Sequence, residues 1–120
     1  MSPELLNKRI AELIFEKKGN DVKLIELYKV TTMTDYFIIC SADSDVQVRA
    51  IADNIEKQLR DEGKKVWFKE GYRSSNWILL DYVDVVVHIF STEARAFYSL
   101  EKLWSDAPTH ELKDELENKL

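Results

Sequence analysis

The sequence has few of the residues that mark disulfide-bonded, linker-rich or low-complexity proteins. Its 120 residues include one cysteine, two prolines and three glycines. The single Cys40 cannot form an intrachain disulfide, so we expect a reducing compartment. No apolar run approaches the roughly 18 residues that a membrane-spanning helix needs, and the first residues lack signal or transit character. We therefore expect one cytoplasmic domain that does not enter a membrane.

The sequence also lacks the signatures of common enzyme classes. Gly19, Gly63 and Gly71 stand too far apart to form a phosphate-binding loop. There is no CxxC, no HExxH and no nucleophile elbow, so we expect no metal and no other cofactor. Cys40 ends an apolar stretch, where a small core residue is usual. The alternative, a Cys40 nucleophile with His88 as its base, has no evident third group to activate it.

What remains is the composition of an acidic globular domain. Apolar types make up 45% of the chain, aromatic types 11% and charged types 32%, which is inconsistent with disorder. The 17 basic and 22 acidic residues give a formal charge of −5. This balance disfavours direct binding of nucleic acid, which requires a cationic surface, and it favours a basic partner.

Hydrophobic periodicity predicts a mixed α/β (α+β-like) domain with a five-stranded sheet. The predicted order is helix, two strands, helix, three strands and helix, with the helices mainly on one face of the sheet. The predicted helices begin at Ser2-Pro3, at Asp43 or Ser44, and at Ser91 or Thr92. The predicted strands span residues 22–28, 36–40, 66–69, 77–80 and 85–90.

The last predicted helix of the domain carries apolar residues at helical spacing, and Tyr98 and Trp104 are expected in the core. Residues 1–108 would form the single domain. Residues 109–120 are predicted as an amphipathic tail helix that docks loosely or on a partner. Its apolar seam consists of Leu112, Leu116 and Leu120.

Helices on one face would leave the other face of the sheet open for binding. Alternation places Trp77, Leu79 and Asp81 on the same face of a strand whose two faces are both apolar. That pattern fits either a fully buried central strand or an aromatic anchor with a polar rim, the composition of a protein-binding hot spot. His88 fits either a hydrogen-bonded sheet histidine or a polar contact on the open face.

Carboxylates provide the main alternative. Glu70, Asp81 and Asp84 could gather at one end of the sheet and hold Mg²⁺ for nucleotidyl or phosphoryl transfer. However, Asp81 and Asp84 are separated by an odd spacing and a turn, and turn aspartates are common. Asp43 and Asp45 have the even spacing, but a helix cap explains them.

Four segments carry a family likeness in matching order and spacing. The main one begins at Glu70-Gly71 and continues after five residues as Trp77-Ile-Leu-Leu-Asp81-Tyr-Val-Asp84-Val-Val-Val-His88-Ile-Phe90. The others are residues 34–39, residues 44–53 and residues 95–104. Together they resemble the ribosomal silencing factor family (RsfS/Iojap), and the likeness covers the chain from about residue 5 to Ala107.

The resemblance implies a non-enzymatic translation repressor. Such proteins bind large-subunit ribosomal protein fourteen on the intersubunit face and block joining of the small subunit. The implied fold is nucleotidyltransferase-like without the catalytic residues, and the implied state is a homodimer. The motif implies Trp77 and Leu79 as apolar anchors, Glu70, Asp81 and Asp84 as partners of basic residues, and Tyr82 and His88 as polar contacts.

This sequence departs from the family pattern at three positions. Val83 and Ala42 replace usual glycines, and Val46 replaces a common arginine. Valine resists a positive φ, so Val83 is expected to exclude an easy positive-φ turn between the two aspartates.

Overall fold

The two long helices begin at serine caps: Ser2, as predicted, and Ser44, one of the two caps that the sequence allows for the second helix. In the computed structural model, which describes residues 1–114, Ser2 precedes α1 (Pro3–Glu16) and Ser44 precedes α2 (Asp45–Asp61). Each serine hydroxyl accepts a hydrogen bond from a backbone N–H of the first turn, at 3.2 Å, which satisfies a donor that the helix itself leaves free. Neither these helices nor any other within residues 1–114 is long and apolar enough to cross a membrane.

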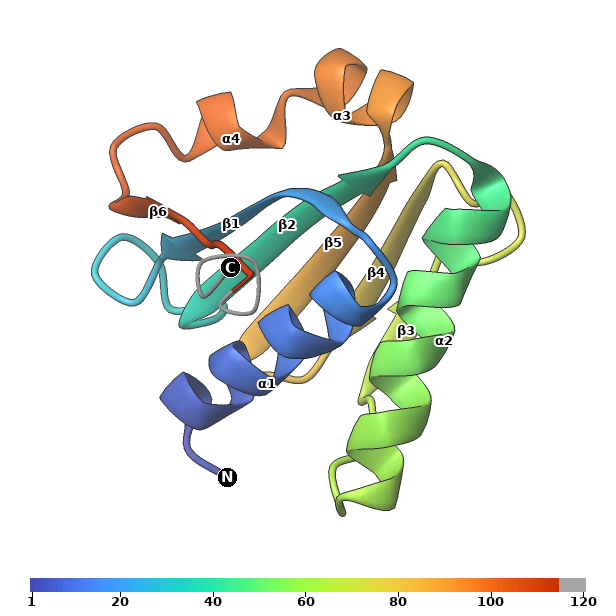
Figure 1. Cartoon of the computed structure of the whole chain (residues 1–120). Coiled ribbons are helices and arrows are strands. Elements are labelled where there is room, and N and C mark those ends of the chain that lie inside the picture. Colours follow the sequence, from blue (N-terminus) through green and yellow to red (C-terminus); the bar gives the residue numbers. More distant parts are fainter. Residues whose placement is uncertain (115–120) are drawn as a thin grey trace.

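Within residues 1–114 the sheet contains six strands in the order β3-β4-β5-β2-β1-β6 (Figure 1). Only the central pair, β2 and β5, is parallel, and every other pair is antiparallel. The mixed sheet is therefore confirmed, but the prediction of five strands is wrong by one. The strands are β1 (Asn20–Glu26), β2 (Tyr36–Ala42), β3 (Phe68–Glu70), β4 (Trp77–Asp81), β5 (Val85–Ser91) and β6 (Thr109–Glu111).

The additional strand comes from the segment predicted as a tail helix. β6 pairs antiparallel with β1, and just beyond it the Leu112 N–H donates to the carbonyl of Val22 at 2.8 Å. The helix prediction is thus wrong for residues 109–111, because the open edge of β1 offers ladder hydrogen bonds and a four-residue leucine spacing gives only a narrow seam. Leu116 and Leu120 lie outside the described residues.

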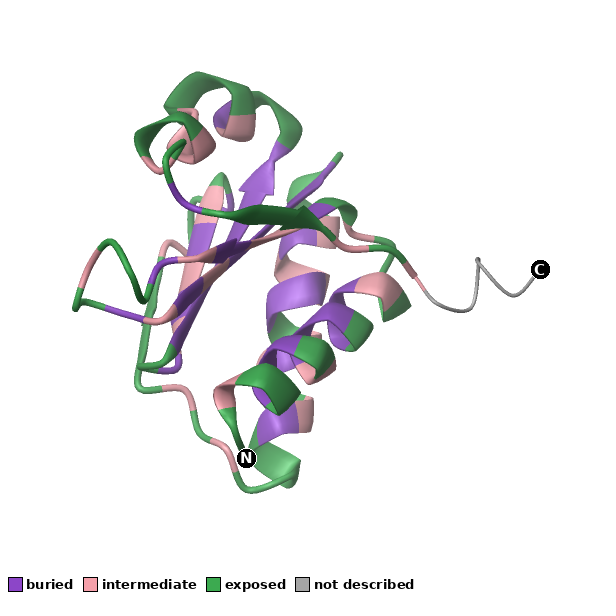
Figure 2. Ribbon diagram, turned by 90° about the vertical axis from the view of Figure 1, so that its left-hand side faces the viewer, coloured by how far each residue is buried: buried purple, intermediate pink, exposed green. Residues whose placement is uncertain are grey.

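Apolar residues pack on both faces of the sheet. The larger core lies between the sheet and the two long helices, and a smaller core lies on the other face beneath the short helices α3 (Thr92–Tyr98) and α4 (Leu100–Leu103). Figure 2 shows α1 and α2 together on one side, with the short helices over one end of the opposite side. The long helices therefore share one face as predicted, and the other face is partly covered.

The predicted third helix is broken in two. Ser99 adopts a left-handed conformation with φ of 47° between α3 and α4, so the apolar side chains do not form one buried stripe. Tyr98 is 50% exposed, and its predicted core position is wrong. Trp104 is half-buried and packs edge-on against Phe37, with ring centroids 6.0 Å apart.

Candidate functional site

The register of β4 and β5 decides which way Trp77 faces. Trp77 lies directly opposite Phe90, and Leu79 lies opposite His88. Directly opposite residues in an antiparallel pair share a face, and Phe90 belongs to the core beneath the short helices. Trp77, Leu79 and Asp81 therefore lie on the face away from α1 and α2, which alternation alone leaves undetermined.

Trp77 sits at the centre of an aromatic cluster that continues onto α3. Its ring stacks on Phe90 and lies against Tyr98, with both centroid distances at 4.9 Å. The Tyr98 ring in turn meets Phe97, whose side chain is 81% exposed. We call the half-buried and exposed members of this region, Trp77, Leu79, Phe97 and Tyr98, the aromatic surface.

Phe97 and Tyr98 are the members of this surface that the motif analysis misses. A signal for them exists in the sequence. Both lie in residues 95–104, one of the four segments that carry the family likeness. Large exposed apolar side chains that gather in one place are typical of interaction sites.

His88 lies beneath the aromatic surface and not at it. Its side chain is 3% exposed, and its Nδ1 accepts a hydrogen bond from Trp77 Nε1–H at 3.0 Å. Burial lowers the pKa of His88 to about 3, so the ring is neutral at physiological pH. His88 is therefore the hydrogen-bonded sheet histidine, and the expectation of a polar surface contact is wrong.

Tyr82 also lies away from the aromatic surface. It is 1% exposed and belongs to the larger core on the side of the long helices. Its hydroxyl has no hydrogen-bond partner within residues 1–114, and burial raises its pKa. A polar contact from Tyr82 on the open face is thus inconsistent with its position, because residues that follow one another in an extended chain point to opposite sides.

Three carboxylates lie on the strands of this face or next to them, and we call them the acidic rim. Glu70 is exposed and lies directly opposite Leu79, on the edge strand β3. Asp81 is half-buried at the end of β4, and Asp84 is exposed just before β5. Within residues 1–114 no three acidic, histidine or cysteine side chains are grouped so as to hold a metal ion, which leaves the magnesium alternative without geometric support.

The turn between the two aspartates has the conformation that Val83 was expected to exclude. Val83 has a φ of 74°. Its N–H donates to Asp81 Oδ1 at 2.7 Å, and its carbonyl accepts from Thr34 Oγ1 at 2.9 Å. These bonds fix the turn even though valine is strained in this region, so the expectation from the missing glycine is wrong.

The loop that leads into Trp77 is also tightly fixed. Gly71 has a φ of 86°, and a Cβ atom built there would lie 1.9 Å from the Trp77 carbonyl oxygen. Farther along, the fully buried Ser75 accepts a hydrogen bond from Arg49 Nη1 at 2.7 Å. Close backbone packing and a buried hydrogen bond therefore define the conformation of the segment that precedes Trp77.

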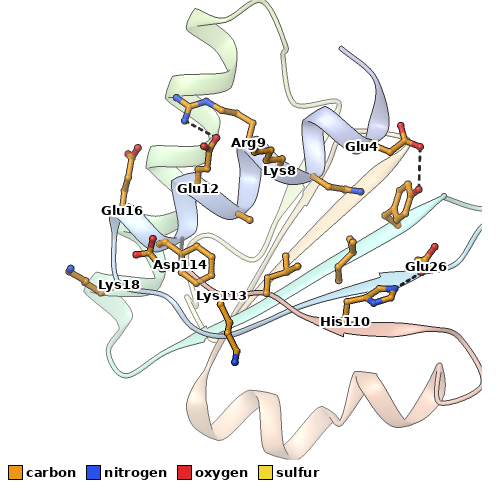
Figure 3. Close-up of a pocket in the computed structure, with 16 residues that line it drawn as sticks. Glu4, Lys8, Arg9, Glu12, Glu16, Lys18, Glu26, His110, Lys113 and Asp114 are labelled. Carbon is orange, nitrogen blue, oxygen red and sulfur yellow. Dashed lines mark hydrogen bonds and ion pairs between the residues drawn. The ribbon is translucent and has the colours of Figure 1, made fainter. Parts of the chain in front are cut away.

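The described residues also form a groove of about 790 Å³, on the other side of the sheet (Figure 3). It runs between α1 and the β1–β6 edge, with Phe15 and Leu24 among its apolar lining residues. Charges of both signs border it, and His110 hydrogen-bonds to Glu26 across the two strands. This groove contains no member of the aromatic surface or the acidic rim.

The chemistry of nucleophilic catalysis is likewise unsupported. Burial raises the pKa of Cys40 to about 12, so its thiol is protonated and unreactive. The fold described above is that of a small mixed α/β domain with a six-stranded sheet.

The chain belongs to the ribosomal silencing factor family. The family model described as "Ribosomal silencing factor during starvation" matches residues 1–119. Ribosomal silencing factor RsfS of Halalkalibacterium halodurans is 39% identical over 113 residues, which cover 94% of this chain and 97% of that protein. The Bacillus subtilis protein of the same name is 38% identical over 112 residues, covering 93% and 95%. The chloroplastic Iojap protein of Zea mays is 36% identical over 106 residues, covering 86% of this chain and 45% of the maize protein.

Solved structures agree with this assignment. A crystal structure of a protein from Chromobacterium violaceum superposes with a TM-score of 0.85 at 31% identity, covering 88% of each chain. A Bacillus halodurans structure gives 0.81 at 37% identity, covering 91% of this chain and 99% of that one. Members of the family are ribosome-associated regulators of translation and not enzymes, so the transferase alternative is set aside.

Proposed function

We propose that this protein represses translation by binding large-subunit ribosomal protein fourteen through the aromatic surface and the acidic rim. Bound there, it would sterically block the association of the small and large ribosomal subunits in the cytoplasm. The proposal rests on the family membership and on the geometry of the face that carries the family's motif.

The position of Trp77 is the observation that carries the proposal. The Trp-to-His motif block lies mostly in strands that could have been buried on both faces. Its tryptophan is nevertheless half-buried and packs against other aromatic rings, and exposed or half-buried carboxylates lie on the same strands or beside them. An apolar centre with a polar rim is the usual anatomy of a protein-binding hot spot.

The charge of the rim indicates the kind of partner. Glu70, Asp81 and Asp84 add local negative charge to a chain with a formal charge of −5. Ribosomal proteins are commonly basic, so opposite charges would steer the encounter and fix its register. The same charges would repel exposed ribosomal RNA, so a protein partner is favoured over a nucleic acid.

A subunit-joining experiment tests the proposal. Purified large and small subunits are sedimented through a gradient at fixed salt and magnesium, with and without the protein. We expect the protein to travel with the large subunit and the joined peak to fall. Protein that stays at the top of the gradient while joining is unaffected would contradict the proposal.

Truncation of Trp77 tests the surface itself. Trp77→Ala should weaken binding to the large subunit by about 2 kcal/mol or more, which is roughly thirtyfold in Kd. Leu5→Ala is the matched control, because Leu5 is 60% exposed on α1, outside the motif face. Equal binding by wild type and a folded Trp77→Ala variant would rule out this surface.

The contribution of charge is tested at Asp81. Asp81→Asn keeps an oxygen that can accept from Val83 N–H, so the turn is retained while the charge is lost. We expect a slower association rate and a weaker salt dependence. Asp61→Asn, at the end of α2, removes the same charge outside the rim and should leave both quantities near wild type.

The family resemblance also implies a homodimer and a nucleotidyltransferase-like fold without catalytic residues. We include the dimer in the proposal. The chain has a mass of 14.1 kDa, so light scattering should give about twice that mass. A monomer at all concentrations would remove the dimer from the proposal without affecting the binding face.

A further inference from the structure

We propose that His88 is a positioning residue that holds the Trp77 ring in the orientation required for binding, without touching the partner. This inference rests on the proposed function, because it assigns a role to a residue buried behind the proposed binding surface. It replaces the direct contact that the family motif implies for His88.

The hydrogen bond between the two side chains is the basis of the inference. Trp77 Nε1–H donates to His88 Nδ1 at 3.0 Å across the β4–β5 pair. Trp77 is opposite Phe90 and Leu79 is opposite His88, so the two bonded residues are diagonal neighbours on one face, within reach for large side chains. Packing against the Phe90 and Tyr98 rings is only weakly directional, whereas a hydrogen bond from Nε1–H favours one combination of the Trp77 χ1 and χ2 angles.

His88 is itself held firmly. It is 3% exposed, and its ring lies edge-on against Phe37 of the neighbouring strand, with centroids 4.4 Å apart. A neutral imidazole with its proton on Nε2 leaves Nδ1 as an acceptor, whereas an imidazolium would only donate. The buried position disfavours the charged form, so the acceptor is available across the physiological pH range.

The other ring nitrogen indicates that this arrangement is not merely structural. His88 Nε2 is buried and has no hydrogen-bond partner within residues 1–114. An unsatisfied buried donor is destabilising, and a leucine or phenylalanine at this position would avoid it. A histidine is therefore costly here unless its Nδ1 serves a purpose, and among residues 1–114 that atom accepts a hydrogen bond from the indole of Trp77.

The test compares variants that lack the acceptor with one that retains it. His88→Phe preserves an aromatic ring and removes the acceptor. If the phenylalanine variant fails to fold, His88→Leu is used, which removes both the acceptor and the ring. His88→Asn places an oxygen near the position of Nδ1. Ile78 lies in β4 and is buried in the larger core. Ile78→Val is therefore a control for the effect of a small loss of stability on binding.

Two measurements are made on each variant. The first is the indole N–H resonance of Trp77 in a ¹H–¹⁵N spectrum, with the indoles of Trp67 and Trp104 as internal references. The second is the Kd for purified large ribosomal subunits. We expect His88→Phe to shift the Trp77 resonance alone and to weaken binding about three- to tenfold. We expect His88→Asn to recover much of the loss, and Ile78→Val to bind as wild type.

The outcomes separate this inference from the proposed function. If Trp77→Ala weakens binding but a folded His88→Phe or His88→Leu binds as wild type, His88 does not position Trp77 for binding and the inference is overturned. If Trp77→Ala itself binds as wild type, the proposed surface fails instead. In the double variant Trp77→Ala/His88→Phe, binding should equal that of Trp77→Ala, and an additive loss would show that His88 acts by another route.

Discussion

Gly71 gives a sharp test of how the loop before Trp77 is built, because the chain contains a matched control. Gly63 and Gly71 have similar positive φ values, 92° and 86°. A Cβ at Gly63 meets nothing within 4 Å, whereas a Cβ at Gly71 would lie 1.9 Å from the Trp77 carbonyl oxygen and 3.0 Å from its carbon. Alanine therefore introduces the same backbone strain at both sites and a collision at one.

The magnitudes follow from these two contributions. A left-handed alanine costs about 1–2 kcal/mol, partly offset by the reduced entropy of the unfolded chain, so Gly63→Ala should lower the free energy of unfolding by about 1 kcal/mol. The collision at Gly71 is with backbone, which has no rotamer to change. Relieving it would require a shift of more than 1 Å at the start of β4, and we expect Gly71→Ala to cost about 3 kcal/mol or more.

Urea denaturation monitored by circular dichroism measures both losses. With a slope of about 1.5 kcal/mol per molar urea, the two variants should differ in midpoint by more than about 1 M. Any surviving folded Gly71→Ala protein should also bind large subunits more weakly, because Trp77 begins the displaced strand. Equal midpoints for the two variants would refute the reasoning from the close approach.

Three further predictions concern Val83, Cys40 and His88. Val83→Gly should relieve the positive φ of 74° and raise the free energy of unfolding by about 1 kcal/mol and the Tm by about 3–5 °C; Val83→Ala, which keeps a Cβ, should gain little, and equal gains would contradict the strain argument. Burial raises the pKa of Cys40 to about 12, so a thiol reagent at pH 8 should label the protein only after unfolding, and rapid labelling of the native protein would contradict this burial. Burial lowers the pKa of His88 from 6.5 to about 3, so the unfolded chain binds a proton between these values that the folded protein does not. The stability associated with neutral His88 is thus fully present above pH 6.5 and declines as the pH falls toward 3, by up to about 1.4 kcal/mol per pH unit. Urea titrations at pH 7.5, 6 and 5 should show a steeper decline for wild type than for His88→Phe, and parallel curves would contradict the prediction.

The local signals in the sequence predict most of the elements. Ser2 caps α1 as predicted, and Ser44, one of the two predicted candidates, caps α2, because capping depends on residues three positions apart. Trp77 and Val85 begin β4 and β5 as predicted, because β-branched and aromatic runs bounded by turn residues specify strands locally. The same block of residues carries the family likeness, so the sequence also identifies the family.

The errors occur where a distant segment decides the outcome. Residues 109–111 form a strand because the edge of β1 is free to pair with them, and nothing within the tail itself specifies that edge. Tyr98 is half-exposed because Ser99 ends α3 in a left-handed conformation, although the helical spacing around it suggests continuity. Val83 adopts a positive φ because side chains of Thr34 and Asp81 hold its backbone.

The sequence by itself determined that Trp77, Leu79 and Asp81 share a face, since the period of a strand is fixed by its covalent geometry. It also determined the acidic charge, the strand block and the family to which they belong. Only the tertiary structure decided that this shared face is the one without α1 and α2, and that His88 lies under Trp77 while Tyr82 turns into the opposite core. Alternation divides residues into two classes, but which class meets solvent depends on where helices distant in the chain come to pack.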